Sequence, residues 1–494
     1  MELQFKKKSC DYVKNLVSRC KEQELTDEIR VPDSLGDVGR ILGAWGQVII
    51  RGKEWRPERV GVTGGVMAWV LYEPEGETTP QMLETWLPFN EQCSIPETQH
   101  DGVIMTQGNL TFCDARSVSP RKLILRVGFC LDVQVYAVAK QDLYTPEDVP
   151  ENIYVRTIQQ PIMLPAEAGE KSFSVEEQLP QPDEITGIDK ILRYNVTPRL
   201  LESKVSGSRI IFRGVADVHV MVLNRNGRVC SFDLEAPFSQ YTQLEKDYED
   251  DAEGTVRFAV TNLELETAEQ HTLRLKAGLT GQYLIKEPVI LEVADDAYCP
   301  AAQLQLQHQQ VELPVLMQHH CNNVRVQRPC KTDGGEIIDA EFLTGLPELH
   351  CKDDKLNLLL SGRFYVLFYD TSSQLQSMTL KWEQEEQTDV VPDVQVQVSV
   401  MSLGKVGADP GGIYSDINTE YICSSPKGIE MISGLTVSES FERTDRPAMG
   451  IRRAGKDRLW DIAKESGSTV EAIRTMTGLA DEPGPEQMLL IPIP

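Results

Sequence analysis

The chain has 494 residues and 41% of them are hydrophobic, so it is long enough to build several hydrophobic cores rather than one. It contains 75 acidic and 49 basic residues, and the resulting net charge of −26 repels nucleic-acid phosphates and anionic lipid headgroups. This charge disfavours a nucleic-acid-binding function.

The N-terminal segment, residues 1–25, has a basic stretch but no apolar run of signal-peptide length behind it. Helix signals are sparse in most of the chain, and one of the few stretches that shows them is residues 12–24, where we expect a short helix. Nowhere do about 18 uncharged apolar residues follow one another, which argues against membrane insertion. Together these features favour a cytosolic location.

The eleven cysteines are scattered from Cys10 to Cys423. Their number is odd and no CxxC pair occurs among them, unlike the dense pairing of a small secreted scaffold. We therefore expect reduced, mostly buried thiols.

A long internal repeat organises the next part of the chain. The stretch PDSLGDVGRIL at residues 32–42 recurs as PDEITGIDKIL at residues 182–192. Further on, a stretch from Gly65 to a Pro-Phe pair recurs from Gly214 to a second Pro-Phe pair, with almost the same offset. A period of this length indicates duplicated domains rather than a solenoid, whose unit has roughly 20 to 50 residues.

The repeated stretches alternate apolar and polar residues, as in RKLILRVGF and HTLRLKAGL, which predicts half-buried antiparallel strands. A degenerate third copy is indicated around Gly362, because LKWEQEE stands where the other copies have Pro-Phe. The run VQVQVSV, with alternate valines from Val394 to Val400, still predicts a strand there. We expect a mainly β fold of tandem antiparallel sandwiches or barrel-like repeats. The expected domains are the N-terminal segment (1–25), the first repeat (26–145), the second repeat (165–298), the degenerate third repeat (312–445) and a C-terminal module (448–494).

Motifs that would carry chemistry are missing or weak. No nucleophile elbow, P-loop, dinucleotide fingerprint or HExxH motif occurs, so we expect neither an enzyme nor a cofactor. The stretch HHCNNVRVQRPC could supply zinc ligands, but its spacing fits no zinc finger, and a linker with incidental thiols is the favoured interpretation. The acidic run at residues 245–254 could bind calcium, yet it lacks the alternating ligands of a calcium loop and favours a solvated hairpin tip. Gly65 and Gly214 are better explained by close packing or a bulge than by phosphate binding.

The pattern changes from Met449 onward. A short strand leads to Gly455, an apolar helical face follows, Gly467 ends that helix, and Ser468 or Thr469 caps the next. The final MLLIPIP predicts a second strand. This is a β-α-α-β unit of about 45 residues, which is too small to hold much spare stability.

This unit resembles a LysM domain in its stretches LWDIAKESG, STVEAI, TGL and LLIPIP. The loop before the Leu-Trp pair is one residue longer than the family pattern, and the Asn common after the second helix is replaced by Met476-Thr477. The resemblance implies two recognition loops and a small core. The implied partner- or glycan-binding residues are Gly455, Lys456, Asp457, Arg458, Thr477, Gly478 and Leu479. The implied core residues are Leu459, Trp460, Ile462 and Ile473, with Trp460 read as core rather than as a contact residue.

The duplicated part is similar to the SPOCS domain of spore coat and sporulation proteins in Firmicutes, through VPDSLGDVGRIL, a Gly-led strand into VLY, LPF, and a Lys-Leu strand after SPRK. Tandem SPOCS-like regions with a terminal LysM are the layout of SipL-type spore morphogenetic proteins. The resemblance implies a coat scaffold on the mother-cell side of the forespore, docked by its LysM module on a stage IV sporulation protein A-like ATPase.

A second function remains open at this point, namely a wall or cortex protein whose LysM module binds peptidoglycan through N-acetylglucosamine. That function would need an export route, and the sequence shows none.

Overall fold

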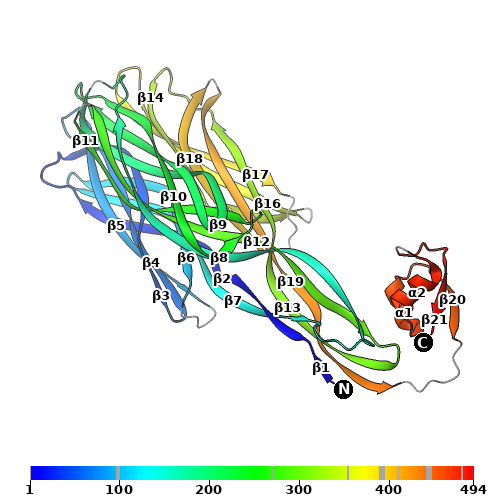
Figure 1. Ribbon diagram of the computed structural model, residues 1–494. Helices are drawn as coiled ribbons and strands as arrows, with labels where there is room; N and C mark the ends of the chain where they lie inside the picture. Colours follow the sequence, from blue (N-terminus) through cyan, green and yellow to red (C-terminus); the bar gives the residue numbers. More distant parts are fainter. Residues whose placement is uncertain are drawn as a thin grey trace.

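Strands make up most of the molecule, and the expected mainly β fold is confirmed (Figure 1). Among the described residues, no helix has the length and apolarity needed to cross a membrane. The computed structural model describes residues 2–95, 101–185, 187–269, 271–352, 355–388, 395–409, 411–440, 448–479 and 482–493.

The first sandwich consists of two antiparallel three-stranded sheets that enclose one hydrophobic core. Alternation directs Leu123, Leu125, Val127 and Phe129 to this core, and all four are fully buried. One sheet contains β2 (Lys6–Arg30), β7 (Lys122–Thr145) and β6 (Val103–Ser119), and the other contains β3 (Val38–Arg56), β4 (Arg59–Pro74) and β5 (Gln81–Ser94).

The second sandwich has the same plan, with β9 covering the positions of both β3 and β4 in the first. Leu273, Leu275 and Ala277 of one sheet pack against Phe212 and Val220 of the other. One sheet contains β8 (Tyr154–Pro180), β12 (Thr272–Tyr298) and β11 (Glu253–Ala268), and the other contains β9 (Ile188–Asn224) and β10 (Val229–Tyr248).

The third sandwich follows the plan again, in the region where the sequence repeat is weakest. The alternating valines of VQVQVSV lie on β18, where Val396 and Val398 are half-buried and Val400 is buried; Val394 lies outside the described residues. One sheet contains β13 (Ala302–Arg328), β19 (Gly412–Ser440), β18 (Gln395–Asp409) and the N-terminal β1 (Glu2–Gln4), and the other contains β14 (Glu336–Thr344), β15 (Glu348–Lys352), β16 (Lys355–Tyr369) and β17 (Leu375–Gln387).

The helix expected over residues 12–24 is wrong, because these residues belong to strand β2, which pairs with β7. A shift of register between Asn15 and Val17 explains the error. The bulge buries Leu16 and Val17 as neighbours, in addition to Tyr12 and Val13. Buried residues spaced in this way imitate the period of a helix.

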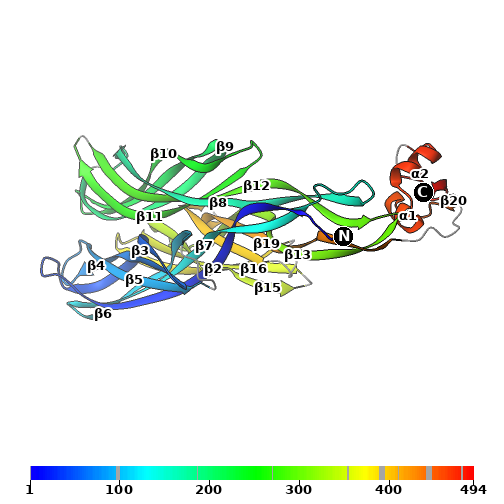
Figure 2. The ribbon, with the colours of Figure 1, turned by 60° about the horizontal axis from the view of Figure 1, so that its bottom comes forward.

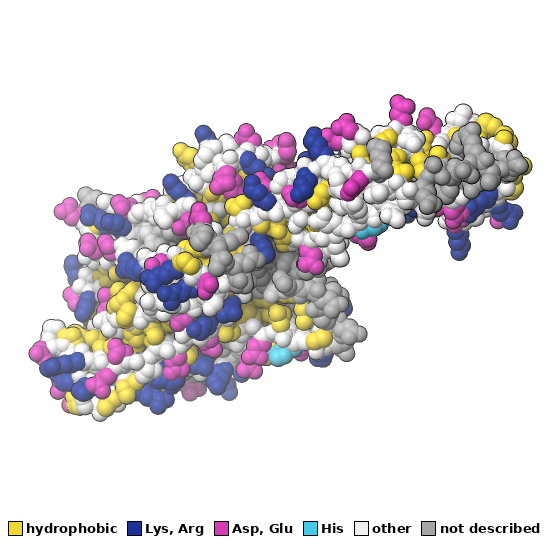
Figure 3. Space-filling view, turned by 90° about the horizontal axis from the view of Figure 1, so that it is seen from below, with side chains coloured by type: hydrophobic (Ala, Val, Ile, Leu, Met, Phe, Trp, Pro, Cys, Tyr) yellow, Lys and Arg dark blue, Asp and Glu magenta, His cyan; other side chains and the backbone are white. Residues whose placement is uncertain are grey.

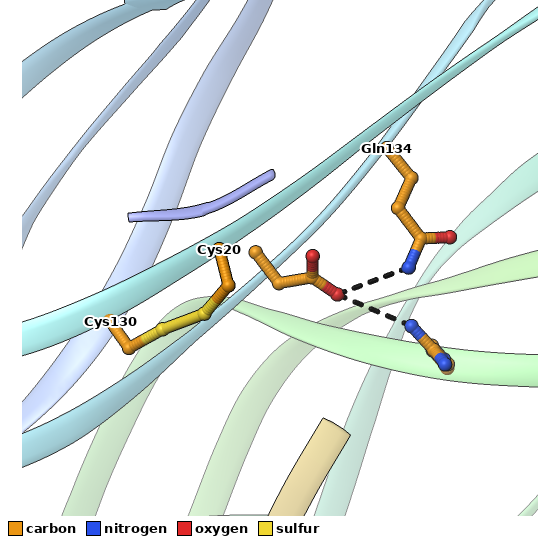
Figure 4. Close-up of a disulfide and its surroundings, with 5 residues drawn as sticks. Cys20, Cys130 and Gln134 are labelled. Carbon is orange, nitrogen blue, oxygen red and sulfur yellow. Dashed lines mark hydrogen bonds and ion pairs between the residues drawn. A yellow bond between two sulfur atoms is a disulfide. The ribbon is translucent and has the colours of Figure 1, made fainter. Parts of the chain in front are cut away.

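The expectation of reduced thiols is wrong for one pair, since Cys20 and Cys130 form a disulfide (Figure 4). The pairing of β2 with β7 places Cys20 opposite Asp132 and Cys130 opposite Glu22, so the two cysteines are diagonal neighbours with Cα atoms 6.4 Å apart. The other nine cysteines are free, and four of them are buried.

Each sandwich contains a glycine that makes room for an aromatic ring on the neighbouring strand. Gly214 lies opposite Phe238, and a Cβ atom at Gly214 would lie 2.4 Å from Cζ of that ring. In the first sandwich the register places Gly64, not Gly65, opposite Phe89. The close-packing explanation is thus confirmed at Gly214, and also at Gly65, where a Cβ atom would lie 2.3 Å from Cζ2 of Trp86.

The three sandwiches meet in a shared core at the centre of the molecule. Trp45 and Trp69 come from the first sandwich, Met221 from the second, and Leu367 and Tyr369 from the third, and all belong to one buried cluster. Each sandwich therefore buries part of its outer surface against the other two, so that the body holds together as one unit.

The ends of six strands continue beyond this body as a narrow stalk, which is formed by the pairs β2–β7, β8–β12 and β13–β19 (Figures 1 and 2). Each pair contributes apolar residues to a common stalk core. These residues include Tyr12, Leu143, Ile162, Leu164, Leu291, Val293, Val311, Leu313, Ile429 and Met431. The stalk carries the C-terminal module at its far end (Figure 2).

Candidate functional site

The C-terminal module has the predicted β-α-α-β order, with strands β20 (Met449–Arg453) and β21 (Met488–Pro492) and helices α1 (Leu459–Ser466) and α2 (Val470–Thr477). The two strands pair in antiparallel fashion. Leu459, Ile462 and Ile473, which the sequence assigns to the core of the module, are fully buried, together with Ala463 and Leu489. The fourth assigned core residue, Trp460, is half-buried and packs against this core at the side that faces the stalk.

Local sequence explains where both helices begin and end. α1 ends at Gly467 and α2 at Gly478, and both glycines adopt the left-handed conformation, with φ of 65° and 73°. Thr469 caps α2, because its Oγ1 accepts a hydrogen bond from the N–H of Ala472 at 3.0 Å. α1 has no cap from its own N-cap side chain; instead the N–H of Leu459 donates to the carboxylate of Glu482 at 3.0 Å.

The first predicted recognition loop, Gly455 to Arg458, is exposed throughout. Asp457 forms an ion pair with Arg452. Neither Lys456 nor Arg458 forms an ion pair with any described residue. This loop therefore presents to solvent two cationic side chains that have no ion-pair partner in the described part of the chain.

The second predicted loop consists of Thr477, Gly478 and Leu479, of which Gly478 is exposed and the other two are half-buried. Thr477 is a structural residue in part, since its Oγ1 accepts a hydrogen bond from the N–H of Leu490 at 3.1 Å. The segment that follows this loop is tied to the first loop, because the N–H of Gly455 donates to the carbonyl of Pro485 at 3.0 Å. The two predicted loops are thus linked through residues 482–487.

Trp460 faces the stalk. Its indole N–H donates to Oδ2 of Asp296 at 2.8 Å, and its ring meets the ring of Tyr298 edge-on, with centroids 4.9 Å apart. One turn further along α1, the ammonium of Lys464 donates to the other oxygen of Asp296 at 2.7 Å. Asp296 and Tyr298 lie at the end of β12. We call this contact the seat of the module.

Arg156, at the start of β8, completes the seat. Its guanidinium lies 5.5 Å from the centroid of the Trp460 ring and 3.8 Å from the carboxylate of Asp461, and it is held in place by Asp295 at 2.9 Å. Burial by itself would raise the pKa of Asp296, but hydrogen bonds from Lys464 and Trp460 outweigh it and hold this pKa below its ordinary value. The carboxylate is therefore charged under ordinary conditions.

A second group of charged residues joins the three sandwiches. The guanidinium of Arg193, which is 1% exposed, lies 3.0 Å from the carboxylate of Asp339 and 2.8 Å from that of Glu341. It also lies over the ring of Trp45, 4.8 Å from its centroid. His219 approaches the same Asp339 at 2.8 Å, although its N–H is not aligned for a hydrogen bond. No local sequence pattern indicates this group, because its members come from β3, β9 and β14.

A cavity of about 540 Å³ opens between the sandwiches. Arg257 lies in its wall, and its guanidinium bridges Asp132 at 3.2 Å and Glu420 at 2.9 Å. One residue of each sandwich thus contributes to this bridge, and both carboxylates neutralise the cation. We assign it a structural role.

The remaining motifs from the sequence are not brought together. Cys321 contacts Asn418 while Cys330 contacts Met378, and the side chain of His319 lies outside the described residues. Among the described residues, no three His, Cys, Asp or Glu side chains cluster as metal ligands would. The acidic run spans the end of β10, the connection at residues 249–252 and the start of β11, with Asp250 exposed as expected. The predicted hairpin is wrong, because β10 and β11 belong to different sheets.

Residues 187–268 match the family model described as SipL, SPOCS domain. The matched region spans β9, β10 and β11 of the second sandwich. The match supports the SPOCS part of the resemblance and points to a sporulation-related protein. No curated protein and no solved structure matches the chain.

Proposed function

We propose that the protein is a non-enzymatic morphogenetic scaffold of the spore coat or envelope, which acts at the forespore surface on the mother-cell side. In this proposal the three sandwiches and the stalk form a rigid support. The C-terminal module, a LysM domain, docks on a stage IV sporulation protein A-like ATPase. The LysM assignment rests on the β-α-α-β order and on the resemblance of the sequence.

The observation that carries the proposal is the way in which the module is held. The seat engages Trp460 and Lys464 of α1, whereas the loop from Gly455 to Arg458 stays exposed, with two cations that form no ion pair with the described residues. A rigid arm that carries an accessible module at its end suits a protein that joins two components of a layer.

The same geometry favours a protein partner over a glycan. Sugar rings are commonly held by stacking on an aromatic side chain, and Trp460 is the only tryptophan of the module. This ring is occupied by Tyr298 and Arg156 of the stalk. Peptidoglycan binding is therefore the second candidate.

The direct test is retention of the purified ATPase by the full chain, compared with a chain that ends at Ser440. We expect retention by the full chain and at least tenfold less by the shortened chain. Sedimentation of the full chain with purified sacculi or spore cortex is the companion measurement. If the full chain sediments with sacculi but does not retain the ATPase, the scaffold hypothesis is wrong and the peptidoglycan-binding hypothesis is supported.

A further inference from the structure

Exposed apolar side chains gather on the outer face of the two-stranded sheet of the module. Met449 and Ile451 of β20 are 46% and 68% exposed, and Met488 of β21 is 54% exposed. Alternation explains the contrast, because the intervening Leu489 and Ile491 point inward and are buried. Figure 3 shows hydrophobic side chains gathered at this end of the molecule.

The register makes these side chains neighbours. Ile451 lies opposite Leu490, and Met449 lies opposite Pro492. Met488 lies two residues before Leu490 on β21, opposite Arg453. All of them belong to one face of the sheet. We call this surface the outer face.

The seat directs the outer face away from the stalk. The helices lie between the stalk and the sheet, since α1 contacts Asp296 on one side and its buried Leu459 and Ile462 pack with Leu489 of the sheet on the other. In Figure 2, β20 accordingly lies on the far side of α1 from the stalk. The exposed side chains of Met449, Ile451 and Met488 are thus turned away from the stalk.

The chemistry of the outer face fits a protein and not a sugar. Methionine, isoleucine, leucine and proline side chains offer neither an aromatic ring nor a hydrogen-bond donor for a hydroxyl group. The charged residue of this face, Arg453, forms an ion pair with Glu486. Flexible methionine side chains are typical of surfaces that adapt to an apolar protein partner.

The size of the outer face argues against a second copy of this chain. Two strands of five residues cover roughly 17 Å by 10 Å, whereas a stable interface buries about 800 Å² on each partner. The contact must therefore continue beyond the sheet. It can do so onto the loop that follows β20 directly, where Lys456 and Arg458 are exposed. A symmetric contact of two copies that included this loop would place the same cations on both sides of one interface, without carboxylates to pair with them.

We propose that the outer face is the surface through which the module binds its protein partner, the ATPase of the proposed function. The matching surface of the partner is apolar at its centre and carries carboxylates at the edge that meets Lys456 and Arg458. This inference rests on the proposed function and adds to it the side of the module that makes the contact.

The test compares two isoleucines of the full chain. Ile451 on the outer face is 68% exposed, and Ile290 on β12 of the stalk is 67% exposed. We expect Ile451→Glu to weaken binding of the purified ATPase at least tenfold, and Ile290→Glu to change it less than twofold. Met488→Gln, which keeps the length of the side chain, should weaken binding severalfold without adding charge.

Folding of each variant is checked by its thermal melting curve and by the indole N–H resonance of Trp460. If Ile451→Glu unfolds the module, Met488→Gln takes its place as the deciding variant. Unchanged binding by a folded Ile451→Glu or Met488→Gln chain would overturn the inference and leave the proposed function standing. Failure of the unaltered chain to bind the ATPase would overturn both.

Discussion

Arg193 carries a charge in the interior of the body, where its side chain is almost completely shielded from water. Asp339 and Glu341 neutralise this charge, and Trp45 covers it. Burial disfavours the charged form of Asp339, but Arg193 and His219 outweigh it and hold the pKa of this carboxyl below its ordinary value. All three sandwiches thus contribute side chains to this buried ion-pair group.

Removal of Arg193 should therefore destabilise the whole body. We expect Arg193→Ala to lower the free energy of unfolding by about 3–5 kcal/mol, because it leaves Glu341 without its buried cation and Asp339 with His219 alone. Chemical denaturation measures the loss. Arg213→Ala is the control, since that exposed arginine lies 3.8 Å from Glu202, and it should cost less than about 1 kcal/mol. A loss at Arg193 no larger than at Arg213 would contradict this role.

His219 should make stability depend on pH. Burial opposes its charged form, but Asp339 and Asp233 outweigh this effect and raise its pKa from 6.5 to about 9. Because the pKa of His219 is higher in the folded protein, its protonation stabilises the fold. This stabilisation is complete below about pH 6.5 and is lost as the pH rises through about 9. We expect the melting temperature of His219→Gln to fall below that of the unaltered chain near pH 6 and to approach it above pH 9. A difference that stays constant from pH 6 to 10 would exclude this titration.

At the seat, one carboxylate holds both Trp460 and Lys464. We expect Asp296→Ala to free the Trp460 indole, so that its N–H resonance moves toward the position of an exposed indole. The other five tryptophan resonances should stay in place. Trp460→Phe identifies the resonance. An unmoved Trp460 signal in Asp296→Ala would mean that the module is not held at this place.

Among the elements, the strands were the most predictable, because alternation in RKLILRVGF and HTLRLKAGL follows directly from burial of one sheet face. Part of β2 was predicted as a helix, because the bulge between Asn15 and Val17 gives its buried residues a helical spacing. The disulfide between Cys20 and Cys130 also depends on a strand pairing that no local pattern reveals.

In the first two sandwiches a strand glycine lies opposite an aromatic ring of the neighbouring strand. We expect Gly214→Ala to destabilise the protein by about 1–3 kcal/mol, because its Cβ would lie 2.4 Å from the Phe238 ring and 2.5 Å from the carbonyl of Arg199. Gly61→Ala is the matched control within a strand, as its nearest neighbour would be 3.8 Å away. Equal melting temperatures for the two variants would contradict the packing argument.

The repeated units and the terminal module were predictable from the sequence, but the way in which they assemble was not. The meeting of Trp45, Met221 and Tyr369 in one core depends on surfaces that look only moderately apolar within each repeat. Trp460 packs against the module core as assigned, but its hydrogen bond to Asp296, 164 positions away, was not predictable for the same reason. Contacts between units leave no periodic signal in either partner.

The scaffold account depends most on where the protein acts and what holds it there. Fluorescent tagging of the full chain in sporulating cells, with and without the stage IV sporulation protein A-like ATPase, measures both together. The account predicts a ring around the forespore that becomes diffuse when the ATPase is removed. Label on the vegetative cell wall, or a ring that persists without the ATPase, would contradict it.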